Sequence, residues 1–346
     1  MCRFNKILSL MLVLITVAGL LISLASCSNT VGGVTFVNLG DKNSVGAIAG
    51  KKFEANIYIP DHINSFKISH ISRSGFRGHD LVTLSMADSI KYIELKAFYE
   101  CDKLESVTFG SGLERIEEFA FKNCYALQSL TLPENLTYIG ESAFYGCYSM
   151  TSLYMPDSVT TVESNAFDDC VGLTSVRLSA NLEKIPAAMF RGCRNITEIT
   201  LPEGITAIGS DAFNECKSLE AITIPNSVTE IGGAAFGACS SLKSVTIPSS
   251  VESIGYGAFW ICDSLTTVTI SEGVISIDAA AFQDCKKLTT VYIPASVLEM
   301  GQGIFNNCES LTDVFYAGSE EQWNAIKGVY GIALPAGTTV HFNHQA

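Results

Sequence analysis

Positive charge is scarce in this sequence. Lysine and arginine number 22 against 35 aspartate and glutamate residues, so the 346-residue chain carries a formal net charge of −13. A surface of that sign repels polyanions, which argues against nucleic acid as a partner. Charged residues of both signs make up only 16% of the chain, whereas hydrophobic residues make up 47%. That balance is typical of a chain with a long continuous core.

Histidine and the common catalytic motifs are also missing from most of the chain. Residues 98–316 contain no histidine, and therefore no imidazole for acid–base or nucleophilic catalysis. No glycine-rich phosphate loop follows a strand-like segment, and no cysteine pair has the C-x-x-C spacing of a metal site. The sequence therefore predicts a protein that is not an enzyme and uses no cofactor or metal. The weak exception is "HFNH", His341 to His344, which offers two metal-ligand side chains near the chain end.

The N-terminus has the pattern of an export signal. Arg3 and Lys6 precede an apolar run over 7–24, and small residues follow it. A charged start, an apolar middle and a small-residue end are typical of a signal peptide, here predicted over residues 1–26. The run is also long enough for an uncleaved membrane anchor, which remains the alternative. Either hypothesis places the folded part outside the cytoplasmic membrane.

The tetrapeptide "LASC", Leu24 to Cys27, resembles the lipobox of bacterial lipoproteins. The resemblance implies cleavage before Cys27 and acylation of that residue, which gives a membrane-anchored lipoprotein at the cell surface. Residues 27–56 are then expected to hold the lipidated cysteine, a tether and an N-terminal cap.

Cysteine and phenylalanine recur with a fixed period. Ten cysteines are spaced 23 residues apart, and a phenylalanine stands three residues before each. The cysteines are Cys101, Cys124, Cys147, Cys170, Cys193, Cys216, Cys239, Cys262, Cys285 and Cys308. A period in this range predicts one elongated body that grows by stacking repeats.

One repeat indicates how each unit folds. In the unit that starts at Cys216, Ile222 and Ile224 alternate with Ala221 and Thr223, which predicts a short strand with one buried face. Proline then ends the strand, because it cannot donate to a ladder. Apolar residues over 235–242 fall three to four apart, which predicts one or two turns of helix. Stacked units would form a parallel sheet with ladders of identical side chains.

The repeat pattern L-x-x-V-x-I-P-x-x-V-x-x-I-G-x-x-A-F-x-x-C resembles the BspA-like leucine-rich repeat family of bacterial surface proteins. The resemblance implies an α/β repeat fold: a right-handed leucine-rich-repeat solenoid with a parallel β-sheet face and short helical or irregular returns. It covers ten regular repeats over 98–316, with degenerate capping repeats over 57–97 and a C-terminal cap over 317–346. It also implies adhesion to host or neighbouring-cell components.

Three hypotheses compete for the repeated cysteines. Metal ligation would need close cysteine pairs, which are absent. Disulfides are plausible in an exported protein, but equivalent residues in a ladder have parallel side chains rather than converging ones. The favoured interpretation is that each cysteine is a small buried hydrophobe with a weak hydrogen-bond donor.

Most outward positions of the predicted sheet carry Ser or Thr, which suit solvent. The exceptions are the partner-binding candidates Tyr154, Arg177, Glu198, Tyr292 and Phe315. Tyrosine and arginine dominate many interfaces, so these residues predict a surface that binds a protein or glycan. Two alternatives remain: Arg177 and Glu198 could simply form an ion pair, and the whole chain could be a structural spacer or self-assembling envelope component. A second group of candidates flanks the returns: Tyr99, Tyr125, Tyr145 and Tyr148.

Overall fold

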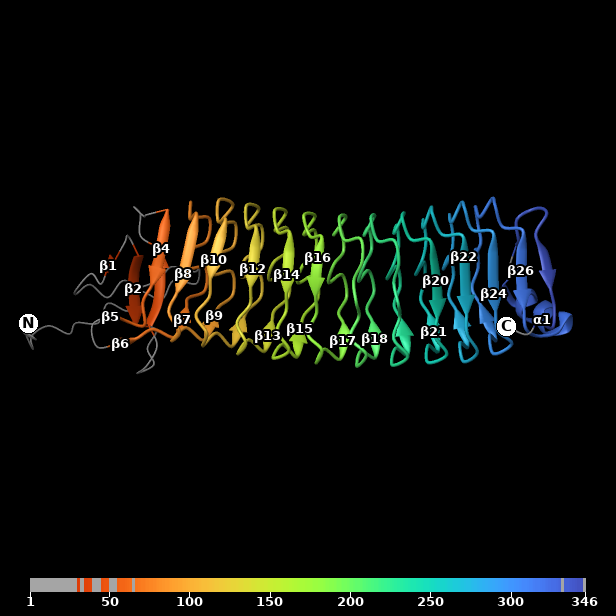
Figure 1. Cartoon of the computed structure of the whole chain (residues 1–346), viewed down its shortest axis with the longest axis horizontal. Helices are drawn as coiled ribbons and strands as arrows, with labels where there is room; N and C mark the ends of the chain where they lie inside the picture. The colour runs from red at the N-terminus through yellow and green to blue at the C-terminus, as the bar shows by residue number, and fades with distance from the viewer. Residues whose placement is uncertain are drawn as a thin grey trace, which may run out of the picture.

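The computed structural model describes residues 30–31, 34–38, 45–49, 55–63, 66–330 and 333–344. The predicted signal peptide over 1–26 and Cys27 lie outside these residues. The described chain forms one long stack of coils, each coil being one repeat, with β4 near one end and α1 at the other (Figure 1). The predicted parallel solenoid is confirmed, because successive coils pair through parallel strands.

Longer strands form two parallel sheets along one side of the stack, with a gap between β16 and β20. Alternate side chains of β14, Ser152 and Tyr154, are exposed while Leu153 is buried, as the alternation predicted. The first sheet has the order β16-β14-β12-β10-β8-β4 and the second the order β20-β22-β24-β26-β27. Their bounds are β4 Asn56–Ile59, β8 Thr83–Met86, β10 Ser106–Thr108, β12 Ser129–Thr131, β14 Ser152–Tyr154, β16 Ser175–Arg177, β20 Ser244–Ile247, β22 Thr267–Ile270, β24 Thr290–Ile293, β26 Asp313–Tyr316 and β27 Thr339–His341.

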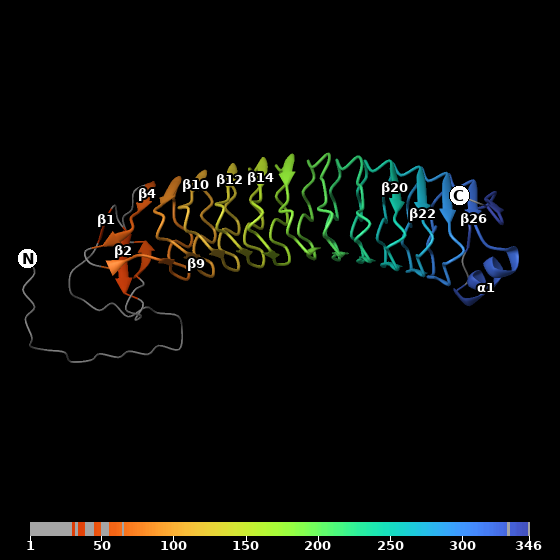
Figure 2. The same cartoon turned by 60° about the horizontal axis from the view of Figure 1, so that its bottom comes forward.

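Two-residue strands form a second ladder along the opposite edge of the stack (Figure 2). The register is one repeat, so that Ile116 lies beside Ile139. These strands are β7 His70–Ile71, β9 Tyr92–Ile93, β11 Arg115–Ile116, β13 Tyr138–Ile139, β15 Thr161–Val162, β17 Lys184–Ile185, β18 Ala207–Ile208, β19 Glu230–Ile231, β21 Ser253–Ile254, β23 Ser276–Ile277 and β25 Glu299–Met300. The ladder is interrupted between β15 and β17. Pro186 explains this gap, because the equivalent glycine Gly209 donates its N–H to the preceding coil and proline has none.

The remaining strands lie near the N-terminal end. An antiparallel sheet contains β1 (Thr30–Val31), β2 (Val34–Asn38) and β3 (Val45–Ala49). A small hairpin contains β5 (His62–Ile63) and β6 (Phe66–Lys67).

The returns between the two ladders are turns, and the predicted helical turns are wrong. Ala234 and Ala238 have φ of 51° and 53°, which lies outside the helical region. The N–H of Phe236 donates to the carbonyl of Ala258 in the next coil, at 2.8 Å, rather than to its own coil. The apolar spacing of three to four residues therefore reflects which turn residues point inward, not an α-helix.

Phenylalanine rings form the centre of the core. The ten predicted phenylalanines are buried, and neighbouring rings stack with centroids 5.0–6.0 Å apart. Phe76 extends this ladder, although it stands 22 rather than 23 residues before Phe98, and its ring lies 5.0 Å from that of Phe98. The predicted phenylalanine ladder is thus confirmed and is one ring longer than the regular repeats.

A helix closes the C-terminal end of the described chain. The helix α1 (Glu320–Tyr330) packs on β25 in place of a further short strand. Trp323 on α1 is buried at the position that isoleucine takes in regular coils, and its ring lies 5.3 Å from that of Tyr316. The strand β27 then pairs with β26 and completes the last coil.

Candidate functional site

The repeated cysteines are part of the core. All ten are buried, and all ten are free thiols. The Sγ of Cys239 donates to the carbonyl of Phe213 in the preceding coil at 3.2 Å, and the same contact recurs along the array. Burial raises the pKa of Cys239 well above its ordinary value, so the thiol stays protonated and unreactive. The buried-hydrophobe interpretation is therefore confirmed, with the thiol donor in use.

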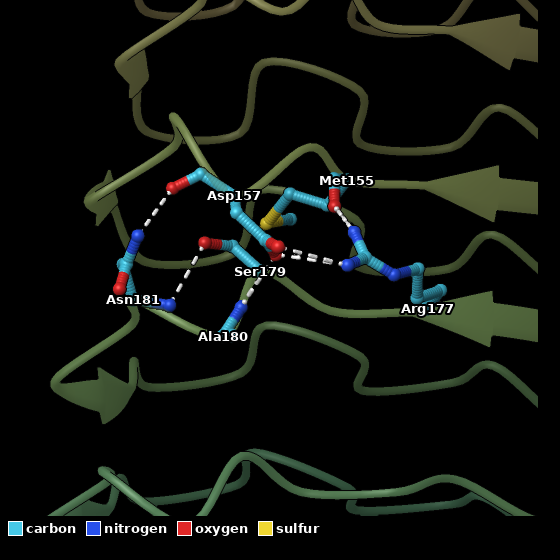
Figure 3. A network of polar contacts seen from close by, with 6 residues as sticks. All are labelled: Met155, Asp157, Arg177, Ser179, Ala180 and Asn181. Atoms are coloured by element: carbon cyan, nitrogen blue, oxygen red, sulfur yellow. Dashed lines mark hydrogen bonds and ion pairs between the residues drawn. The ribbon is translucent and has the colours of Figure 1, made fainter.

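Tyr154 and Arg177 lie side by side on the long-strand face, in β14 and β16. The guanidinium of Arg177 stacks 4.7 Å from the centre of the Tyr154 ring. It also donates to both carboxylate oxygens of Asp157 at 3.0 Å and to the carbonyl of Met155 at 2.8 Å (Figure 3). Asp157 in turn accepts the backbone N–H of Ala180 at 2.9 Å. Several donors of Arg177 are thus occupied within the protein.

The proposed ion pair between Arg177 and Glu198 is wrong, because Arg177 pairs with Asp157 of the preceding coil. Glu198 is exposed on the next coil and lines a shallow hollow of about 440 Å³ together with Thr174 and Thr223. The structure therefore brings Tyr154 and Arg177 together and leaves Glu198 in a separate environment.

The other two candidates, Tyr292 and Phe315, belong to a row of aromatic rings near the C-terminal end. Their rings stack 5.0 Å apart, and His341 stacks on the other side of Phe315 at 4.5 Å. His344 leans against the row, 4.8 Å from Phe315 and 5.6 Å from Tyr292. We call Tyr292, Phe315, His341 and His344 the aromatic row.

Hydrogen bonds fix the far end of the aromatic row. A ring nitrogen of His341, Nε2, lies 2.8 Å from Oδ1 of Asp313. This contact and the hydroxyl of Thr312 hold the pKa of Asp313 below its ordinary value of 3.8. The backbone N–H of His344 donates to the carbonyl of Tyr316 at 3.3 Å. The two histidines of "HFNH" are thus part of an aromatic stack. No group of metal-ligating side chains is found among the described residues.

A hollow of about 470 Å³ lies beside the aromatic row. It is lined by Tyr292, Phe315 and His344 and by residues at the ends of β22 and β24. Glu272 stands at the rim, where its Oε1 accepts the backbone N–H of Ala295 at 3.0 Å.

Two further surfaces carry side chains of note. Among the tyrosines that flank the returns, Tyr125 and Tyr148 stack 5.1 Å apart, both exposed, and Lys122 covers Tyr145 at 4.1 Å. On the short-strand face, a groove of about 600 Å³ is lined by glycines, serines and three acidic residues: Glu230, Asp278 and Glu299.

Sequence analysis missed the contributions of Asp157, Glu272 and His341. Asp157 and Glu272 follow the strands at variable positions that give no signal by themselves. The place of His341 beside Phe315 was missed because His341 stands 26 rather than 23 residues after Phe315, so the repeat period does not align the two. The pairing of β27 with β26 restores that alignment in space.

No helix among the described residues is long and apolar enough to cross a membrane. The anchor predicted at the N-terminus falls outside them and stays a prediction.

The model of the BspA-type leucine-rich repeat region matches residues 69–197 and 183–312. A leucine-rich repeat protein from Bacteroides ovatus is similar in structure, with 22% identity, 90% of this chain and 99% of that chain covered, and a TM-score of 0.61. A leucine-rich repeat protein from Eubacterium ventriosum is 20% identical, with 92% of this chain and 95% of that chain covered and a TM-score of 0.54. The pneumococcal vaccine antigen PcpA is 19% identical, with 90% of this chain and 98% of that chain covered and a TM-score of 0.50. No curated protein matches the chain. These likenesses show the same fold.

Proposed function

This chain belongs to the BspA-type leucine-rich repeat family, and on that premise we propose that it is a non-enzymatic binding protein of the bacterial cell surface. It recognises a protein or glycan partner of a host or neighbouring cell through the long-strand face of its solenoid. Solenoid faces of this kind offer an extended, rigid surface whose exposed positions vary without affecting the core.

The aromatic row is the observation that carries this proposal. Outward positions along most of the long-strand face hold Ser or Thr, whereas the row holds Tyr292, Phe315 and two histidines beside a hollow. Stacked rings supply contact area at low entropic cost, because the neighbours already hold each ring in place. Tyr154 with Arg177 forms a second, smaller candidate, in which Asp157 fixes the guanidinium in advance.

A lipid anchor at Cys27 would hold the protein at the membrane. The motivation is the "LASC" sequence directly after the apolar run. A single acyl chain gives only marginal binding, and stable attachment requires more than one chain. The proposed location is therefore extracytoplasmic and membrane-anchored.

A pull-down tests the binding function. The purified chain is incubated with host matrix proteins and with cell-wall glycans, and the retained material is identified. The proposal expects a saturable partner whose retention drops when surface residues of the long-strand face are replaced. If no saturable partner is retained from either source, the chain is better explained as a structural spacer.

A further inference from the structure

The aromatic row has one open end. The outward positions Thr269, Tyr292, Phe315 and His341 lie side by side on β22, β24, β26 and β27. Three of the four carry rings, which stack at 4.5–5.0 Å. His341 covers one side of Phe315, but Thr269 is too short to cover the outer side of Tyr292. One face of the Tyr292 ring is therefore left uncovered on the side of Thr269. A fourth ring placed there would continue the stack.

The hollow beside the row occupies that place. Its lining includes Thr269, Tyr292 and Pro294, and its volume of about 470 Å³ falls in the range of small-ligand sites. Polar groups surround the open ring: the hydroxyls of Thr269 and Ser271 and the carboxylate of Glu272. One carboxylate oxygen, Oε1, is used by the N–H of Ala295, whereas Oε2 has no protein partner among the described residues.

The lining selects the chemistry of the occupant. Among the described residues that line the hollow there is no lysine or arginine. The chain also carries a net charge of −13, so an anionic ligand would be repelled. A phenyl side chain from a peptide could stack on Tyr292. It would, however, strip water from Glu272 and the two hydroxyls and give no hydrogen bond in return, which is costly. A pyranose avoids this cost, because one face carries C–H groups and its edge carries hydroxyls.

We propose that this hollow binds a neutral pyranose unit of a glycan, with its C–H face stacked on Tyr292 and its hydroxyls bonded to Glu272, Thr269 and Ser271. The inference rests on the proposed function and deepens it, since it names the class of partner and the place of contact. Phe315 and His344 act as positioning residues, because their rings lie against the Tyr292 ring at 5.0 Å and 5.6 Å.

Titration with defined sugars tests the proposal. The purified chain is titrated by calorimetry and by ligand-observed NMR with hexaoses of glucose, galactose, mannose and N-acetylglucosamine. At least one should bind, and Tyr292→Ala should weaken that binding at least tenfold. Tyr58→Ala is the matched control, because it removes an exposed tyrosine from the equivalent outward position of β4, on an earlier coil of the same face. It should leave the sugar affinity unchanged.

Two further variants probe the open position itself. Thr269→Trp should fill the space over Thr269 and abolish sugar binding while the melting temperature stays near that of the parent, since the position is not part of the core. Glu272→Gln keeps hydrogen-bonding capacity without charge, so a neutral sugar should lose affinity by less than about fivefold. A loss above a hundredfold would indicate a cationic ligand instead and would overturn the proposal.

Other outcomes also contradict it. Absence of binding by all four hexaoses, or equal losses in Tyr292→Ala and Tyr58→Ala, would refute a sugar site here. Binding of a phenylalanine-rich peptide in place of any sugar would assign the hollow to a protein partner. If Tyr292→Ala retains the partner found by pull-down while no sugar binds, the glycan site fails and the general binding function survives.

Discussion

At the scale of the residue, each coil repeats the same two buried side chains for a physical reason. The phenylalanine ring stacks on the rings of the neighbouring coils, and the cysteine thiol donates to the carbonyl of the phenylalanine in the preceding coil. In each of the ten coils, therefore, the phenylalanine fills the core and the cysteine donates a hydrogen bond to a buried carbonyl. Replacement of the phenylalanine removes contacts with the rings of both neighbouring coils.

The first prediction concerns Phe213. Phe213→Ala should lower the free energy of unfolding by about 3–5 kcal/mol, through lost burial and the cavity left behind. The ring lies 5.8 Å from Phe190 and 5.3 Å from Phe236, so no neighbour can collapse into the space without breaking the stack. Urea unfolding measures the change, with the exposed Thr223→Ala as control. Equal losses in the two variants would contradict the ladder.

The second prediction concerns the buried carboxylate of Asp168. Its side chain is fully buried, and Arg191 donates to both of its oxygens. Arg191→Ala leaves that carboxylate without its partner and should cost about 1–3 kcal/mol. The control is Arg194→Ala, which removes an exposed pair with Glu215 and should cost less than about 1 kcal/mol. Similar losses in both variants would show that burial of Asp168 does not matter.

The stability loss of Arg191→Ala should depend on pH, and its direction follows from the pKa of Asp168. Burial raises the pKa of Asp168 above its ordinary 3.8, and Arg191 counteracts this rise. Removal of Arg191 should therefore raise the pKa further, so the folded state holds the proton more tightly than the unfolded chain. The loss of stability in Arg191→Ala should grow as pH rises above 3.8 and shrink on acidification. Urea unfolding at about pH 4 and about pH 7 measures it.

At the scale of the element, the stack is not uniform. Met189 replaces the alanine that precedes the phenylalanine in neighbouring coils, and the rings on both sides of Phe190 separate to 5.8 Å. The bond from the N–H of Phe167 to the carbonyl of Met189 is 3.1 Å, whereas the bond from Phe213 to Ala235 is 2.7 Å. Ile304 takes the same position in the last regular coil, where the rings of Phe282 and Phe305 are 6.0 Å apart. A larger side chain at this position widens the spacing between coils.

The third prediction concerns the gap between the long strands β16 and β20, which lies beside the coil that contains Met189. Residues 198–201 and 221–224 form no strand, although they lie within the described chain and have the same apolar pattern as β22 and β24. Their amides should exchange with solvent about tenfold faster than those of Thr267–Ile270 and Thr290–Ile293. Hydrogen–deuterium exchange with mass spectrometry measures the ratio. Uniform protection along the long-strand face would mean that the ladder is continuous in solution.

Much of this element-scale structure could be predicted from the sequence. Ile222 and Ile224 are buried, as their alternation predicted, because burial repeats with the period of the chain. The strand predicted over these residues is wrong, since 221–224 form no strand. The returns could not be predicted, since Ala234 and Ala238 adopt positive φ only because bonds to the next coil compensate the strain. The partner of Arg177 depended on how a coil turns after its strand, which no spacing reveals.

At the scale of the whole molecule, the two proposed functional regions are far apart in the sequence. The aromatic row lies on β24, β26 and β27 and the following residues, near the end of the stack that α1 closes (Figure 1). The lipid anchor is proposed at Cys27, before the described strands begin. A chain anchored in this way would present the row away from the membrane, at the full length of the solenoid.

The fourth prediction concerns that anchor. Cys27→Ser should give uncut precursor that no longer incorporates labelled fatty acid, because the acylated thiol is absent. Metabolic labelling followed by electrophoresis measures both effects. The control is Cys2→Ser, which removes a cysteine ahead of the apolar run and should leave labelling and cleavage unchanged. Unchanged labelling in Cys27→Ser would place the anchor elsewhere.

The most direct measurement of the central claim is an exchange footprint of the bound partner on the solenoid. Amide exchange of the intact chain is compared with and without a saturating amount of the glycan or protein that it binds. The account predicts added protection over 267–272, 290–295, 313–317 and 339–344, and none along the short-strand face. Protection confined to the short-strand face, or none at all with the partner bound, would contradict it.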